Sequence, residues 1–379
     1  MRPSAHRASC ASVAPWATRI WWKAWAASRP CWAKPSKPVD TVRDLAQLPK
    51  AHLHLHFTGS LRLTTLVELA QAHGVRLPHL LLGGEPLGLN PSERGWFRFQ
   101  RLYDAARHAV VGEAALRRVV REAAQDDAAE GSGRLELQID PTTYGASVGG
   151  ITPALEIVID EAKAASRTTG VDIGLVVAAS RTRHPLEART LARLAVKYAG
   201  NGPGEVVGFG LSNDERRADT AVFGPAFELA HRAGLAAVPH GGELLGPDHI
   251  RQIMDCLHPQ RIGHGVRAVE DPATLDLVAQ RGIALELCPL SNVALGVYDQ
   301  PSQVPLRPIV EAGIKVALGA DDPLLFRSRL VDQYRVARED LGFSDPELAA
   351  LARASVEASR ASDGVKRRLL AGIDAWLAG

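Results

Sequence analysis

Short apolar runs alternate with longer amphipathic stretches along the chain from residue 40 onward. Eight of the apolar runs have the length and the residue types of β-strands. These predicted strands cover residues 51–56, 134–139, 171–178, 206–211, 235–239, 261–263, 283–287 and 314–318. The stretches between them show the apolar spacing of amphipathic helices, so the pattern predicts alternating strands and helices.

Helix signals stand at the ends of the amphipathic stretches. Residues 271–282 begin with Asp271, an N-cap residue, and Pro272 follows at the first helical position. Residues 184–200 and 224–234 are two further helical patterns. Three predicted helices end in a glycine directly before a strand, namely Gly234, Gly282 and Gly313.

The spacing of the strands predicts the fold class. After the first strand, successive strands start roughly 22 to 37 residues apart, the length of one strand and one helix. Eight such units predict an α/β protein with a (β/α)₈ TIM barrel, and roughly 340 residues is within the range of that fold. We therefore expect residues 40–379 to form a single domain.

The first connection, residues 59–133, is longer than the others and predicts a helical insertion after the first strand. It contains the aromatic cluster "WFRFQRLY" at residues 96–103. An insertion here would lie over the mouth of the barrel. Trp96, Phe97 and Phe99 would then either belong to a substrate lid or form the core of the extra helices.

Residues 1–39 differ from the rest of the chain. They contain seven Lys or Arg, no Asp or Glu, and five of the seven tryptophans. The segment has the bias of a targeting peptide, but Pro15, Arg19 and Lys23 interrupt the apolar stretch that a secretory signal needs. We interpret it as a disordered or mis-assigned N-terminal extension, with a targeting peptide as the alternative.

The charge balance limits the partners. With 44 basic and 42 acidic residues the formal net charge is +2, so no strong field would attract nucleic acid or an acidic membrane. No apolar run approaches the ~18 residues that a membrane helix needs. The charge balance favours a small-molecule ligand instead. The four cysteines, at 10, 31, 256 and 288, show no paired spacing, which favours a reducing, cytoplasmic location. One sequence does not decide the oligomeric state.

Three histidines alternate in "HLHLHFTGS", residues 52–60, and point to one side of the first strand. His52 and His56 would lie about 13 Å apart, too far to share one ion. Chemistry in a barrel takes place at the C-terminal ends of the strands, and Thr58 with Gly59 marks this end. The pair His54 and His56 is therefore the candidate for metal binding.

Other strands carry polar residues at the same end. The fifth ends in "VPHGGE", the sixth in "RIGHG" and the eighth in "ALGADDP", which adds His240, His264, Asp321 and Asp322. Asp322 precedes a proline and could instead be a helix N-cap, and Glu243 could be an ordinary loop carboxylate.

Five motifs in this order, "LPKAHLHLHFTGSL", "HGGE", "RIGHG", "CPLSN" and "GADDP", resemble the adenosine deaminase family of zinc-dependent barrel hydrolases. The resemblance covers almost the whole chain after residue 40. It implies hydrolytic deamination of adenosine or 2'-deoxyadenosine to inosine and ammonia, in purine metabolism. It also implies one Zn²⁺ per chain, held by three imidazoles and a carboxylate, the ligands being His54, His56, His240 and Asp321.

The resemblance also implies roles for the remaining candidates. Glu243 would protonate a ring nitrogen of the purine, and His264 would orient the attacking water and act as its base. A raised pKa, caused by burial, would keep Glu243 protonated. The residues expected against the substrate are Asp322, at the far ring nitrogen, with Asn213, His56 and Thr58.

Three positions depart from the family pattern. Thr58 replaces the acidic residue that usually meets the ribose or marks the free-base branch, Gln138 replaces a common arginine, and Asn213 replaces a glycine. The substituent on the purine is therefore open. The fourth strand ends without the lysine of binuclear relatives, so one metal is expected.

Other functions remain as alternatives. A deaminase of adenine, or of a modified adenine nucleoside such as aminodeoxyfutalosine, fits the same motifs. A hydrolase of an amide or ester is disfavoured without the strand-four lysine. A non-catalytic nucleoside-binding barrel is hard to reconcile with the complete ligand set. The chain has neither the H-x-E and P-C-x-x-C motifs of cytidine deaminases nor a Walker-type phosphate loop.

Overall fold

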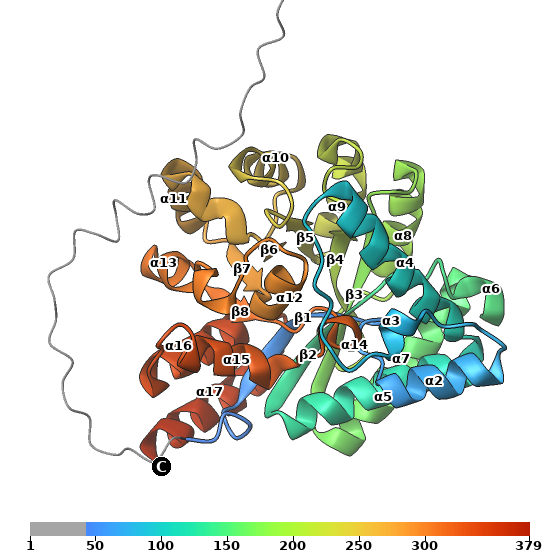
Figure 1. The fold of residues 1–379 in the computed structure, drawn as a ribbon, viewed down its shortest axis with the longest axis horizontal. Coiled ribbons are helices and arrows are strands. Elements are labelled where there is room, and N and C mark those ends of the chain that lie inside the picture. Colours follow the sequence, from blue (N-terminus) through green and yellow to red (C-terminus); the bar gives the residue numbers. More distant parts are fainter. Residues whose placement is uncertain (1–42) are drawn as a thin grey trace, which may run out of the picture. The chain divides into compact units, whose positions relative to one another are not determined.

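Eight parallel strands follow one another around a single sheet in chain order (Figure 1). The computed structural model describes residues 43–379. Its strands are β1 (Lys50–His56), β2 (Ser132–Ile139), β3 (Asp172–Ser180), β4 (Val206–Ser212), β5 (Ala236–Gly241), β6 (Arg261–His264), β7 (Ala284–Leu287) and β8 (Val316–Leu318). The predicted N-terminal extension, residues 1–39, lies outside the described residues.

Backbone hydrogen bonds bring the last strand back to the first. The amide of Asp321 donates to the carbonyl of His54, and the amide of His56 donates to the carbonyl of Asp321, both at 3.0 Å. These bonds form an isolated bridge between Leu55 and Asp321, just beyond the end of β8. The sheet is thus a nearly closed barrel, which confirms the predicted (β/α)₈ fold.

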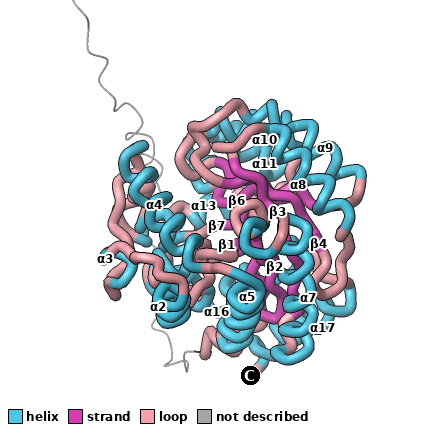
Figure 2. The backbone as a smooth tube through the Cα atoms, turned by 90° about the vertical axis from the view of Figure 1, so that its right-hand side faces the viewer, coloured by secondary structure: helices cyan, strands magenta, loops and turns pink. Residues whose placement is uncertain are grey.

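Helices surround the strands in the ribbon view, and the tube view shows the strands inside them (Figures 1 and 2). The α-helices are α2 (Leu63–Ala72), α3 (His79–Leu82), α4 (Glu93–Ala109), α5 (Gly112–Ala129), α6 (Gly145–Val148), α7 (Ile151–Thr169), α8 (Pro185–Lys197), α9 (Gly224–Arg232), α10 (Pro247–Leu257), α11 (Pro272–Gln280), α12 (Pro289–Ala294), α13 (Leu306–Glu311), α14 (Pro323–Phe326), α15 (Leu330–Glu339), α16 (Asp345–Ala358) and α17 (Asp363–Ala378). Short 3₁₀ helices are η1 (Thr220–Phe223), η2 (Val266–Glu270) and η3 (Pro301–Gln303).

Local signals in the sequence place the helix ends. The side chain of Asp271 accepts a hydrogen bond from the amide of Thr274 at 2.8 Å and so caps α11, as predicted. Gly234, Gly282 and Gly313 follow α9, α11 and α13 with φ of 76°, 64° and 81°. In this left-handed region a side chain would be strained, which explains glycine at these helix ends.

Four predicted strands, the third to the sixth, end one or two residues too early, and the fifth and sixth matter for the site. The sequence pattern ends the fifth strand at residue 239 and the sixth at 263, but the ladder continues because His240 pairs with Gly263 and Gly241 pairs with His264. Pro239 interrupts the apolar run without ending the strand. The extension matters because it places both histidines on regular backbone at the C-terminal end of the barrel.

The insertion between β1 and β2 contains α2, α3, α4 and α5. In the two views α4 lies across one end of the barrel (Figures 1 and 2). Phe99 of α4 is buried and stacks on Phe326 of α14, with ring centroids 5.8 Å apart, whereas Phe97 is 63% exposed. The aromatic cluster is therefore divided between packing and solvent. No helix in the described part of the chain is long and apolar enough to cross a membrane.

Candidate active site

Three of the predicted metal ligands meet at the end of the barrel that α4 covers. The Nε2 atoms of His56 and His240 lie 3.1 Å apart, and the ring of His54 lies within 5.2 Å of both other rings, measured between centroids. Their candidate ligand atoms all lie within 4.8 Å of one another. β1 supplies two of these histidines and β5 the third, so the strand ends bring distant residues together.

Asp321 joins this group from the segment after β8. Its Oδ1 atom lies 3.2 Å from Nε2 of His56 and 3.5 Å from Nε2 of His54. Its Oδ2 atom accepts a hydrogen bond from the hydroxyl of Ser291 at 2.6 Å. One carboxylate oxygen is thus held by the protein while the other faces the imidazoles. His264 also approaches His54 and Asp321, which makes a second possible set of ligands.

The charges at His54 suit a cation. Burial lowers the pKa of His54, but the carboxylates of Asp321 and Glu286 outweigh burial and raise the pKa to about 10. Nε2 of His54 is buried and has no hydrogen-bond partner among the described residues. Burial and the neighbouring imidazoles lower the pKa of His240 well below its usual value, which favours the neutral form that a metal needs. These donors fit a divalent metal ion.

A buried ion-pair chain stands behind His54. Nδ1 of His54 lies 2.8 Å from Oε2 of Glu286, and the other oxygen of Glu286 accepts from Nε of Arg261 at 2.6 Å. Arg261 also pairs with Glu136, which pairs with Arg134. Because a carboxylate only accepts hydrogen bonds, Nδ1 of His54 donates to Glu286, and Nε2 is the nitrogen that faces the site.

Glu243 and His264 lie next to each other beside the imidazoles. Oε1 of Glu243 lies 3.7 Å from Nε2 of His264, and both residues are buried. Burial, together with the carboxylates of Asp321 and Glu215, raises the pKa of Glu243 well above its usual value. Burial and His54 lower the pKa of His264 to about 4. These shifts favour the carboxylic acid form of Glu243 and the neutral imidazole of His264, the forms that the two predicted roles require.

Asp322 occupies the N-cap position of α14, but its side chain makes no capping hydrogen bond. Its Oδ1 atom is buried without a partner in the described part of the chain. Burial and the neighbouring Asp321 raise the pKa of Asp322 well above its usual value. The carboxyl packs so closely on Gly59 that a Cβ there would lie 1.8 Å from Oδ1, which explains this glycine in "HFTGS".

Three of the predicted site residues have a left-handed backbone. The φ angles are 78° at Asn213, 65° at His264 and 60° at Asp321. Non-glycine residues rarely adopt this conformation, which costs of order 1–3 kcal/mol and concentrates at functional sites. The surrounding contacts must hold these residues in place.

Two cavities adjoin at this end of the barrel. The inner cavity, of about 60 Å³, contacts three carboxyl groups and three histidines of the predicted site; the lining includes His56, His240, Glu243, His264, Asp321 and Asp322. The outer cavity, of about 230 Å³, extends past Thr58 and Asn213. Both cavities contact His56, Tyr103 and Arg107, so the two spaces are continuous along one side of α4.

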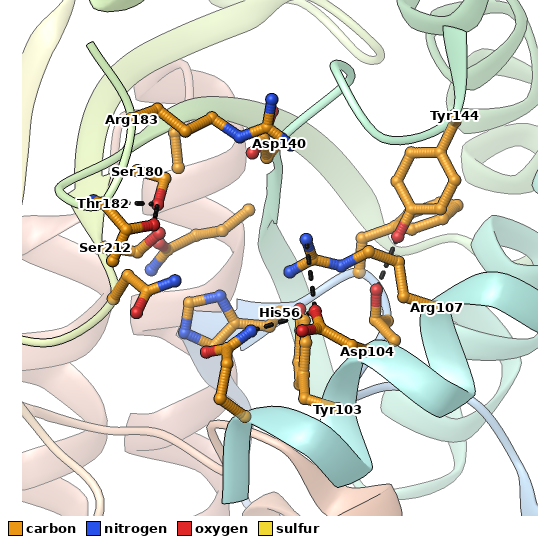
Figure 3. A pocket seen from close by; sticks show the side chains of 16 residues that line it. His56, Tyr103, Asp104, Arg107, Asp140, Tyr144, Ser180, Thr182, Arg183 and Ser212 are labelled. Atoms are coloured by element: carbon orange, nitrogen blue, oxygen red, sulfur yellow. Dashed lines mark hydrogen bonds and ion pairs between the residues drawn. The ribbon is translucent and has the colours of Figure 1, made fainter. Parts of the chain in front are cut away.

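Figure 3 shows the polar lining of the outer cavity. The hydroxyl of Thr58 is hydrogen-bonded to that of Tyr144 at 2.5 Å, and the guanidinium of Arg107 lies over the ring of Tyr103. Asp140 and Arg183 stand on the opposite wall. Thr58 therefore contributes no charge to the outer cavity, and the charged groups in its lining come from other segments of the chain.

One face of α4 lines both cavities. Trp96, Phe99, Gln100, Tyr103 and Arg107 recur at the spacing of one helix face, and all of them contact the inner cavity. Nε1 of Trp96 is buried and lacks a hydrogen-bond partner among the described residues. Both interpretations of the aromatic cluster therefore apply to Phe99, which packs on Phe326 and also lines the inner cavity.

Sequence reasoning missed the residues that hold the site in place. Glu215 accepts hydrogen bonds from the amides of Glu243 at 3.0 Å and of the next two residues. Arg181 donates to the carbonyl of His240 at 2.8 Å. Glu286 supports His54. A signal existed for Glu286, because it is a lone charge within the apolar run of the seventh predicted strand.

A barrel that carries a cluster of histidines and an aspartate at its C-terminal end has side chains suited to holding a metal ion for hydrolysis. More specifically, the sequence profile of the adenosine deaminase family matches residues 49–376, so the chain belongs to the adenosine deaminase family. It is an aminohydrolase of the adenosine/adenine deaminase type.

Three known proteins show this similarity. A Streptomyces virginiae protein named "Putative adenosine/adenine deaminase" is 58% identical over 342 residues, which span 90% of this chain and 100% of that protein. The structure of adenine deaminase from Arthrobacter aurescens superposes with a TM-score of 0.79 at 28% identity, over 87% of this chain and 99% of that one. The structure of Arabidopsis ADAL complexed with IMP superposes with a TM-score of 0.76 at 26% identity, over 87% of this chain and 97% of that one.

Proposed function

We propose that this chain is a zinc-dependent deaminase of 6-aminopurine nucleosides, with adenosine as the first substrate to test. The observation that carries the proposal is the meeting of His54, His56, His240 and Asp321 beside the pair Glu243 and His264 at the inner cavity. Three imidazoles and a carboxylate form a typical zinc ligand set. When bound, the ion acts as a Lewis acid and makes water nucleophilic near neutral pH.

The residues around the ion would divide the proton transfers between them. Glu243, protonated because its pKa is raised, would donate its proton to the ring nitrogen next to the reacting carbon. His264, neutral because its pKa is lowered, would accept a proton from the attacking water. Asp322, whose pKa is also raised, would share a proton with the far ring nitrogen and orient the purine.

The outer cavity supports a nucleoside rather than a free base. A free purine base in the inner cavity would leave the outer cavity, about 230 Å³ in volume, unfilled. A substituent on the purine could fill it, extending past Thr58. In this proposal the substituent is the ribose, which would extend along α4 toward Asn213 and Arg107. Thr58, already bonded to Tyr144, would contact the ribose without the charge of an acidic residue.

A second candidate has a specific observation in its favour. Arg183 lines the outer cavity alone, and Arg107 lines both cavities, at the place where they adjoin. Cations in this position suit an adenosine with a larger, anionic group at its 5' end. Aminodeoxyfutalosine is one nucleoside of this kind.

A substrate panel tests the proposal. The full chain is produced with zinc supplied, its metal content is measured, and deamination of adenine, adenosine and 5'-substituted adenosines is followed by ultraviolet absorbance. We expect about one zinc per chain and a kcat/KM for the nucleosides at least ~10-fold above that for adenine. Higher kcat/KM for adenine would contradict the nucleoside assignment. Bound zinc without turnover of any 6-aminopurine would contradict the reaction.

A further inference from the structure

His52, the first histidine of "HLHLH", is buried below the site and is not used by the proposed chemistry. Nε2 of His52 accepts a hydrogen bond from the amide of Ala320 at 3.0 Å. Nδ1 lies 2.9 Å and 3.2 Å from the two carboxylate oxygens of Asp127, near the end of α5. The side chain therefore bridges the insertion helix and the residue directly before Asp321.

The two partners define the form of the imidazole. An amide N–H can only donate, so Nε2 of His52 must be an acceptor without a proton. Nδ1 then carries the proton and donates it to the Asp127 carboxylate. This is the neutral tautomer, and it is assigned by its hydrogen bonds. Both ring nitrogens and both neighbours are satisfied in a region where all three side chains are buried.

The bond to Ala320 lies between two backbone hydrogen bonds, from the amide of Gly319 to the carbonyl of Leu287 and from the amide of Asp321 to the carbonyl of His54. β8 ends at Leu318, and beyond it the link to β1 is the single bridge between Leu55 and Asp321. Nε2 of His52 thus accepts the hydrogen bond that the amide of Ala320 would donate to a carbonyl of the neighbouring strand if β8 were longer. Left without an acceptor, the buried amide of Ala320 would be costly.

The residue after Ala320 needs such support. Asp321 has a φ of 60°, a strained conformation for an aspartate. Its backbone is held by His54 and His56, its Oδ2 by Ser291, and the peptide before it by His52. Together these contacts determine where Oδ1 points.

We propose that His52 is a positioning residue that fixes the backbone before Asp321 and so directs the Asp321 carboxylate toward the metal. This inference rests on the proposed metal centre, because it concerns the geometry of one of its ligands. His52 would touch neither substrate nor metal. The first histidine of the motif would then serve the same site from below.

Two substitutions separate the two halves of the bridge. In His52→Asn the amide can replace Nδ1 toward Asp127 but does not reach Ala320. In His52→Gln the longer side chain can place an oxygen near the position of Nε2 and accept from Ala320. His231→Gln is the matched control, because His231 is a half-buried helix histidine bonded to the carbonyl of Leu257, away from the site.

The measurement is zinc affinity of the full chain by competition with a chelator, with thermal unfolding of the zinc-free protein as the check on folding. We expect a loss of ~10-fold to ~100-fold in affinity for His52→Asn, the range found for residues that support metal ligands. His52→Gln and His231→Gln should stay within ~3-fold of wild type. Wild-type affinity in His52→Asn, or equal losses in both His52 variants, would overturn the proposal.

A second readout keeps the inference separate from the proposed function. Hydrogen exchange of the Ala320 amide in the zinc-free chain should be ~10-fold faster or more in His52→Asn, and close to wild type in His52→Gln. Unchanged exchange in His52→Asn would overturn the role of His52 even if zinc binds and adenosine is deaminated. A wild-type chain without zinc affinity would instead overturn the proposed metal centre, and exchange would still decide whether His52 holds this segment.

Discussion

The inner and outer cavities are continuous, yet they are built in different ways. At the inner cavity two of the predicted metal ligands are each held by a second buried residue, as Glu286 holds His54 and Ser291 holds Asp321. The outer cavity is lined by polar groups that bond to one another, as Thr58 does to Tyr144. The strand ends therefore fix the groups suited to chemistry, while the insertion and the loops around it shape the space suited to selectivity.

The largest effect is expected from the inner cavity. Glu243→Gln retains the size of the side chain but removes its acidic proton, so kcat should fall ~10²-fold to ~10⁴-fold. Steady-state deamination of the preferred nucleoside, with metal content measured in parallel, checks this. Glu228→Gln, on the exposed part of α9, is the control. Near wild-type kcat in Glu243→Gln would show that another group supplies the proton.

The next effect concerns the support of the inner cavity. Glu286→Gln should reduce zinc affinity ~10-fold to ~100-fold, because the neutral amide no longer holds Nδ1–H of His54 as strongly. Chelator competition measures the change. Glu136→Gln is the matched comparison, since Glu136 belongs to the same ion-pair chain without touching His54. A larger loss of affinity in Glu136→Gln would place the control of the metal elsewhere in the chain.

A smaller effect is expected in the outer cavity. Arg107→Gln should raise KM ~10-fold for nucleosides that carry an anionic 5' group, because a charge-assisted contact is lost. KM for adenine should change less, since adenine would contact Arg107 only from the inner cavity and would not fill the outer one. Arg183→Gln should have a weaker effect, because Arg183 is 41% exposed at the rim. An equal change for adenine would mean that Arg107 acts on the purine instead.

The buried ion pairs also predict a dependence of stability on pH. Burial raises the pKa of Glu136, but Arg261 and Arg134 outweigh burial and lower it to about 2. The unfolded value is ~4.3, so this contribution to stability is present above pH ~4.3 and is lost as the pH falls toward 2. Thermal unfolding between pH 6 and 3 should show Glu136→Gln to be less sensitive to acid than wild type. Parallel curves would contradict this role.

The smallest effect is expected from Thr58→Val. This change removes the hydroxyl that bonds to Tyr144 and leaves the volume nearly unchanged. If Thr58 contacts the ribose only weakly, kcat/KM for adenosine should fall by less than ~5-fold. A much larger loss, restricted to nucleosides, would show that Thr58 replaces the usual acidic residue in binding the sugar.

The sequence predicted the parts of this molecule that local patterns encode. Alternating strands and helices gave the barrel, and residues at the strand ends gave the candidate ligands. The motif "ALGADDP", at the end of the eighth predicted strand, also placed Asp321 near His54, because the C-terminal ends of parallel strands meet at one end of a barrel.

The supporting residues could not be predicted in the same way. Glu286 lies 232 positions from His54 along the chain, and only the closed barrel brings them together. The pairing of His52 with the Ala320 amide joins residues 268 positions apart, and although the strand pattern ends the eighth strand at residue 318 as observed, it does not show which side chain faces that amide. The outer cavity depends on how α4 lies across the barrel, which amphipathic spacing alone does not determine.

The most direct test of the central claim is the anomalous diffraction of crystals of the zinc-loaded full chain. The account predicts a single zinc peak ~2.0–2.2 Å from Nε2 of His54, His56 and His240 and from one carboxylate oxygen of Asp321. A peak held instead by His54, His264 and Asp321, the other set of donors at this end of the barrel, would contradict the account. So would the absence of zinc from this cavity.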